Sequence, residues 1–111
     1  ASAKTPAELF AELPVVVATP ELHLPMPEDQ HASFMASLDP LATALFADGE
    51  ISRLDGLRVD YPDRWGLVRP SNTTPNLVLR FEGDDAAALA SIENEFRSLL
   101  RAVDPTLALT F

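Results

Sequence analysis

A short polar segment between two strand-like stretches carries the side chains best suited to chemistry. Residues 69–74 read Arg-Pro-Ser-Asn-Thr-Thr, so an arginine, an asparagine amide and three hydroxyl groups lie within six residues. A guanidinium group offers a planar fork of donors, and hydroxyl, amide and backbone N–H groups complete a set of donors suited to an anion. The segment therefore predicts a phosphate-binding loop between strands.

The same residue types also favour turns. Serine, asparagine and threonine stabilise turns through hydrogen bonds between their side chains and nearby backbone groups. Composition alone therefore leaves two interpretations open, a loop that binds an anion and a loop that only turns the chain. The surrounding charge is compatible with the first, because residues 57–80 hold four arginines against two aspartates.

Composition limits the class of function. The chain has 111 residues, 47% of them hydrophobic, a net charge of −9 and no cysteine. We expect one domain with a single core, and no nucleic-acid or membrane partner, because an acidic chain repels both surfaces. Without cysteine there is no disulfide framework and no thiolate nucleophile or metal site. Neither a signal segment nor a long apolar run is found, so a cytoplasmic location is expected.

The order of the predicted elements indicates the α+β class. Patterning predicts, in chain order, a strand at 21–26, a helix at 28–46, strands at 51–54, 57–61, 65–69 and 77–82, and a helix that follows a cap at 83–85 and ends at 103. This order favours an antiparallel sheet with helices on one face. We also expect Asp39-Pro40 to break or kink the first long helix, and Asp55-Gly56 to form a two-residue type I′ turn.

The first twenty residues differ from the rest. Residues 1–13 are interpreted as a leading segment from a preceding domain or from added sequence, with a short helix at 5–13. Residues 14–20 place valines between two prolines, which indicates either a hinge or linker or a buried strand. The predicted domain then comprises residues 21–111.

Other chemistry-bearing residues are better explained as structural. Acidic residues at 48–55 and 82–85 are typical of turns and helix caps, and His23 and His31 have no ligand pattern beside them, so no metal site is predicted. No serine has an activating pattern, so no catalytic residue is predicted. Trp65 begins a strand, and we expect it in the core rather than stacked on a sugar.

Three stretches of the chain resemble a known family. Residues 56–61 (Gly-Leu-Arg-Val-Asp-Tyr), 65–75 (Trp-Gly-Leu-Val-Arg-Pro-Ser-Asn-Thr-Thr-Pro) and 77–82 (Leu-Val-Leu-Arg-Phe-Glu) are similar to the C-terminal, fourth domain of bacterial phosphomannomutase/phosphoglucomutase, in the α-D-phosphohexomutase family. The likeness begins near residue 19 and is densest after residue 55. It implies a TATA-binding-protein-like α+β fold, in agreement with the predicted order of elements.

The resemblance also implies a function. Members of this family interconvert hexose 1-phosphate and hexose 6-phosphate, of mannose or glucose, through a bisphosphorylated intermediate. By position in the motif, Arg69, Ser71, Asn72 and Thr73 would bind the non-reacting phosphate of the substrate, and Thr74 would support the loop. The nucleophilic phosphoserine of such enzymes lies in an earlier domain. The isolated chain is therefore expected to be catalytically inactive.

Cofactors and partners follow from the same resemblance. No cofactor is expected in this domain, whereas Mg²⁺ and a glucose 1,6-bisphosphate activator are implied for the full-length enzyme. The implied partners are a phosphosugar substrate and the other domains of the same monomeric enzyme, with residues 14–20 as the hinge. The alternative is a free-standing interaction domain whose 69–75 loop is a structural turn or binds another anion.

Overall fold

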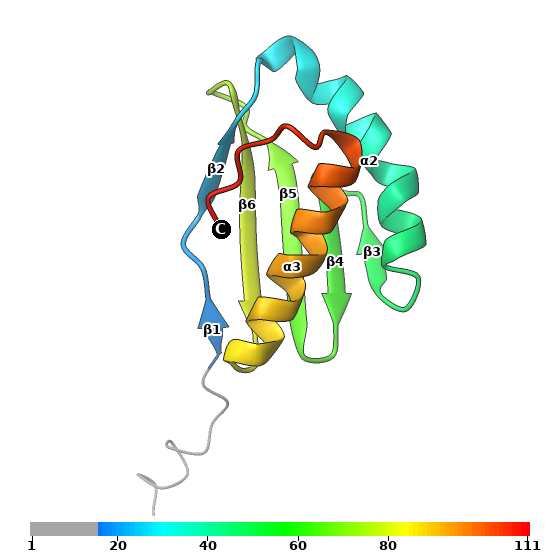
Figure 1. Ribbon diagram of the computed structural model, residues 1–111, viewed down its shortest axis with the longest axis vertical. Helices are drawn as coiled ribbons and strands as arrows, with labels where there is room; N and C mark the ends of the chain where they lie inside the picture. Colours follow the sequence, from blue (N-terminus) through cyan, green and yellow to red (C-terminus); the bar gives the residue numbers. More distant parts are fainter. Residues whose placement is uncertain (1–15) are drawn as a thin grey trace, which may run out of the picture.

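An antiparallel sheet of six strands forms the frame of the computed structural model, which describes residues 16–111 (Figure 1). The strands are β1 (Val17–Ala18), β2 (Leu22–Pro25), β3 (Glu50–Ser52), β4 (Leu57–Tyr61), β5 (Arg64–Pro70) and β6 (Asn76–Gly83). The last four form a meander in the order β6-β5-β4-β3, and β1 and β2 both pair with the outer edge of β6. The predicted α+β class is confirmed. The helix predicted at 5–13 lies outside the described residues.

Part of the predicted hinge segment belongs to the sheet. β1 pairs antiparallel with the end of β6. Directly after β1, the N–H of Thr19 donates to the Phe81 carbonyl at 2.9 Å, and the Thr19 hydroxyl accepts from the Phe81 N–H at 3.1 Å. Residues 17–19 are therefore bonded to β6 and move with it.

Two long helices cover one face of the sheet (Figure 1). α2 (His31–Leu45) follows a 3₁₀ turn, η1 (Glu28–Gln30), and α3 (Ala86–Val103) follows β6. The predicted cap of α3 is formed by Asp85, whose carboxylate accepts the Ala88 N–H at 2.7 Å. α3 packs on β5 and β6, and α2 packs beside α3. Within residues 16–111, neither helix has the length and hydropathy needed to cross a membrane.

α2 runs through Pro40 without interruption, so, of the break or kink expected at Asp39-Pro40, the break is wrong. A proline inside a helix leaves the carbonyl four residues earlier, here that of Ala36, without its backbone hydrogen bond. Pro40 and Ala36 are both exposed, so water can bond this carbonyl. Leu38 and Ala42 are fully buried on either side of the proline. Packing thus keeps the helix intact where local propensity disfavours it.

A chain of aromatic side chains joins the helices to the sheet. Phe96 of α3 lies between Phe46 and Phe81, with ring centroids 5.2 and 5.1 Å away. Phe111, in the C-terminal tail, packs on Phe81 at a centroid distance of 5.1 Å. Gly66 of β5 lies beside the Phe96 ring, since an added Cβ at this position would be 2.5 Å from Phe96 Cε1. α3 approaches the sheet closely because β5 carries no side chain here.

The opposite face of the sheet carries no helix among the residues described (Figure 1). We call it the open face; it displays alternate residues of the meander, among them Arg58, Trp65 and Arg69. The Arg58 guanidinium lies 4.2 Å from the centre of the Trp65 ring, and the Trp65 Nε1–H donates to Glu82 at 2.7 Å. The expectation that Trp65 lies in the core is wrong, because side chains alternate along β5 and its neighbour Gly66 takes the core side.

Replacing Gly66 with alanine should lower the free energy of unfolding by about 1–3 kcal/mol, because the added methyl group would overlap the Phe96 ring. Urea denaturation followed by circular dichroism measures the change. In the double variant with Phe96→Leu, the loss of unfolding free energy should be smaller than the sum of the losses in the two single variants. Strict additivity of the two would contradict the packing described.

Candidate functional site

The predicted anion-binding residues lie at one end of the β5–β6 hairpin. Pairing of these strands ends where Pro70 lies opposite Leu77. Just beyond it, the Ser71 N–H donates to the Asn76 carbonyl at 2.9 Å. The loop of residues 71–75 is thus closed at its base by the hairpin that carries it.

Ser71 organises this loop from within. Its Oγ accepts the Thr74 N–H at 3.2 Å, the Thr74 hydroxyl at 2.8 Å and, at 3.4 Å, the Thr73 N–H. Thr74 Oγ1 in turn accepts from the side-chain amide of Asn76 at 3.0 Å. In all three contacts Ser71 Oγ is the acceptor, which leaves its own O–H to donate to another group.

Asn72 and Thr73 form the tip of the loop. Both residues are exposed. Among the hydrogen bonds of residues 16–111, none involves the Asn72 side chain or the Thr73 hydroxyl. Their donors are therefore available to a ligand, whereas the polar atoms of Ser71 and Thr74 hold the loop together.

Arg69 stands beside the loop on the open face. It lies opposite Val78, and its side chain is 28% exposed. Its ion-pair partner within the described range is Asp55, with Arg69 Nε 3.9 Å from Asp55 Oδ2. The end of the guanidinium, where the two Nη groups form a fork, thus remains open to a bidentate anion.

The connection between β3 and β4 lies against Arg69, a contact that sequence reasoning missed. It comprises residues 53–56, so the predicted strand to Leu54 is too long. The predicted type I′ turn is also wrong, because it needs positive φ at both central residues and only Gly56, at 72°, has it. The Asp55-Gly56 pair indicated a turn, but no signal in one sequence states which residue of β5 that turn will face.

Replacing Ser71 with alanine should speed hydrogen exchange at the Thr74 amide by about 2- to 10-fold, since one hydrogen bond to that amide is lost. Amide exchange followed by NMR measures the rate. Thr73→Ala serves as the control, because the Thr73 hydroxyl holds no such bond in the loop. An unchanged rate in Ser71→Ala would show that other contacts hold the loop.

Comparison with known proteins bears on the family to which this chain belongs. The model of the family "Phosphoglucomutase/phosphomannomutase, C-terminal domain" matches residues 11–99. A phosphomannomutase/phosphoglucomutase of Pseudomonas aeruginosa is 45% identical over 103 residues, which cover 93% of this chain and 22% of that protein. A phosphoglucomutase of Neisseria meningitidis is 43% identical over 99 residues, which cover 87% of this chain and 21% of that protein.

A solved structure shares the fold. The crystal structure of a phosphoglucomutase/phosphomannomutase family protein from Burkholderia thailandensis matches with a TM-score of 0.74 at 44% identity, over 98% of this chain and 22% of that one. The chain thus spans about a fifth of the length of the relatives it matches, 22% in the Pseudomonas protein. Its matched range, its sequence identity and its fold together show that this chain belongs to the family of phosphoglucomutase/phosphomannomutase C-terminal domains.

Proposed function

We propose that this chain is the domain of a phosphohexomutase that holds the non-reacting phosphate of the substrate. The observation that carries the proposal is the position of Arg69 on the open face beside a loop whose internal bonds leave Asn72 and Thr73 free to donate. Arg69, Ser71, Asn72 and Thr73 are the proposed ligands, and Thr74 is the proposed support of the loop.

Local charge and hydrogen bonding can outweigh the acidic character of the chain. The net charge of −9 opposes an anion, but exposed charges are largely screened beyond about 8 Å at physiological ionic strength. Hydrogen bonds to charged groups contribute roughly 1.5–3 kcal/mol each. Arg80 adds a second positive charge on the open face. It lies on β6, two residues after Val78, the residue that is opposite Arg69.

In the full-length enzyme, we infer the transfer of a phosphoryl group between the 1- and 6-positions of mannose or glucose through a bisphosphorylated intermediate. A grip on the phosphate at one end of the sugar would fix the distance of the other end from the reacting groups of the other domains. Because the loop would bind a phosphate rather than the sugar ring, it could hold either end of the intermediate. The same grip would therefore serve both halves of the reaction.

Mg²⁺ and a glucose 1,6-bisphosphate activator belong, in this proposal, to the full-length enzyme. Residues 16–111 contain no group of three His, Cys, Asp or Glu side chains placed to hold a metal ion, so no step is assigned to a metal here. Ser71 is bonded to threonines rather than to an imidazole or carboxylate, and so lacks the base that an activated serine needs. We therefore expect the isolated chain to bind phosphosugar weakly and to show no turnover.

Residues 14–20 are the proposed hinge segment, which would bend before Val17 as the domain closes over its substrate. Residues 17–19 are bonded to β6 and would move with the sheet. Closure would exclude water from the transfer, and reopening would let the intermediate turn around. The other domains of the same monomeric enzyme are the partners that this motion requires.

Titration of the chain with inorganic phosphate or glucose 1-phosphate should shift the amide NMR signals of Arg69 and of residues 71–74. Arg69→Ala should abolish these shifts, because the bidentate donor is lost. Arg69→Lys should retain weak binding, because the charge remains without the fork. Both variants should keep the wild-type circular dichroism spectrum.

Arg101→Ala is the matched control, since it removes one positive charge from the exposed side of α3, on the helix-covered face of the sheet. Its phosphate titration should equal that of the wild type. If phosphate leaves the wild-type loop unmoved, or if Arg69→Ala binds it equally well, the loop is a structural turn or binds another anion and the proposal fails.

A further inference from the structure

The connection between β3 and β4 is built against the backbone of Arg69. Gly56 has a φ of 72°. A Cβ at this position would lie 2.5 Å from Arg69 Cβ and 2.7 Å from Arg69 Cα, and would also overlap the Val68 carbonyl oxygen. These are backbone atoms and the root of a side chain, which cannot swing away. Only glycine fits here, both for its φ and for the space that Arg69 occupies.

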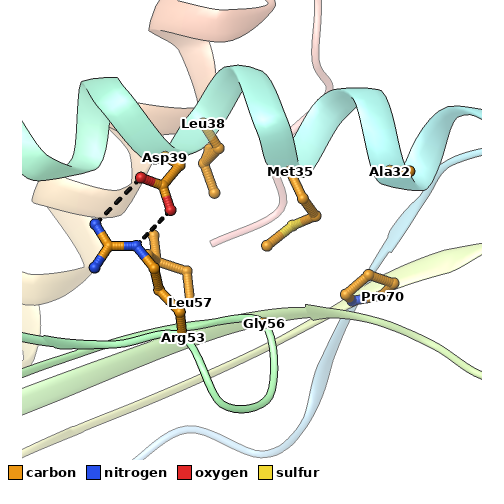
Figure 2. A pocket seen from close by; sticks show the side chains of 8 residues that line it. All are labelled: Ala32, Met35, Leu38, Asp39, Arg53, Gly56, Leu57 and Pro70. Carbon is orange, nitrogen blue, oxygen red and sulfur yellow. Dashed lines mark hydrogen bonds and ion pairs between the residues drawn. The ribbon is translucent and has the colours of Figure 1, made fainter.

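The same connection is fixed to α2 by Arg53 (Figure 2). Arg53 donates to both oxygens of Asp39 at 2.6 and 3.1 Å, and to the Thr43 hydroxyl at 2.9 Å. The bond to Arg53 holds the pKa of Asp39 below its ordinary value, so the pair stays charged into the acidic range. A cleft of about 300 Å³ separates α2 from Gly56 and Pro70, and the Arg53 ion pair bridges it.

Asp55 contacts the guanidinium group of Arg69 on its Nε side. Its Oδ2 lies 3.9 Å from Arg69 Nε, the nitrogen nearest the stem of the guanidinium. An acceptor on that side leaves the two Nη groups for another anion. Asp55 is 80% exposed, and exposed ion pairs contribute little to stability.

We propose that Gly56 and Asp55 are positioning residues for Arg69. Gly56 sets where the Arg69 backbone lies, and Asp55 restrains the guanidinium at Nε so that both Nη groups face the substrate phosphate. This positioning also depends on α2, because Arg53 bonds the connection to that helix. A helix on the covered face of the sheet is thereby linked to the proposed phosphate site on the open face. The inference rests on the proposed function of Arg69 and adds two residues outside the family motif of residues 69–74.

Gly56→Ala should weaken the binding of inorganic phosphate by roughly tenfold, the loss expected when one charge-assisted hydrogen bond is misaligned. Gly49→Ala is the matched control: its Cβ would crowd Val59 Cγ1 at 2.9 Å, away from Arg69. Both variants should lose stability in urea, but only Gly56→Ala should lose affinity. Equal affinity in the two folded variants would overturn the role of Gly56.

Asp55→Asn tests the orientation directly, and does so even if Gly56→Ala fails to fold. In the absence of ligand, it should shift the Arg69 Nε–Hε NMR signal and speed its hydrogen exchange, while the Arg53 Nε–Hε signal stays in place. Phosphate affinity should fall about threefold, the scale of one exposed ion pair. An unmoved Arg69 signal, or an affinity that stays equal or rises, would show that Asp55 does not position Arg69.

The binding of phosphate by Arg69 and the positioning of Arg69 by Asp55 can be tested separately. The Arg69 Nε–Hε signal reports its orientation without any phosphate present. If that signal responds to Asp55→Asn but the wild-type chain binds no phosphate, the proposed function fails while the contact between the residues stands. If phosphate binds through Arg69 but Asp55→Asn changes neither signal nor affinity, only the positioning role fails.

Discussion

The register between β5 and β6 decides on which side of the sheet Arg69 lies. Arg69 is opposite Val78, and Val68, one residue earlier, is opposite Leu79. Because side chains alternate along a strand, a slip of one residue would bring Arg69 into the core and Val68 onto the open face. Val68 and Leu79 are at most 1% exposed. Their burial opposes the slip, so the hydrophobic core is what keeps the guanidinium outward.

The loop of residues 71–75 depends on the same hairpin. Its base is closed by strand pairing, and its interior by the hydroxyl groups of Ser71 and Thr74. Ser71 and Thr74 make most of the bonds inside the loop, whereas the Asn72 side chain and the Thr73 hydroxyl make none of them. A rigid scaffold that ends in a polar tip is a common way for a fold to present binding groups.

Much of the fold could be predicted from the sequence, where local and tertiary preferences agree. The apolar spacing of α3 and its Asp85 cap act together, and the helix begins where they predict. Pro40 is the opposite case, because buried neighbours on the same helix outweigh its local preference. The residue type of Trp65 predicts a place in the core, although its position in the alternation of β5 puts it on the open face.

The candidate site, like the fold, has features that the sequence predicts and one that it does not. Arg69 and residues 71–74 are contiguous, so their grouping is visible in the sequence. The contact of Gly56 with Arg69 depends on the register between β4 and β5 and on a four-residue connection, at positions 53–56, where a two-residue turn was expected. A single sequence carries no signal for such a contact, because it arises only when the strands are aligned.

Trp65 is the single tryptophan of the chain, and it lies on the open face rather than in the core. Its ring is covered by Arg58 and its indole N–H is bonded to Glu82. Its fluorescence therefore reports on a polar surface along the same strand as Arg69, not on the packing of the helices. The molecule thus contains an intrinsic optical probe of whatever approaches this side of the sheet.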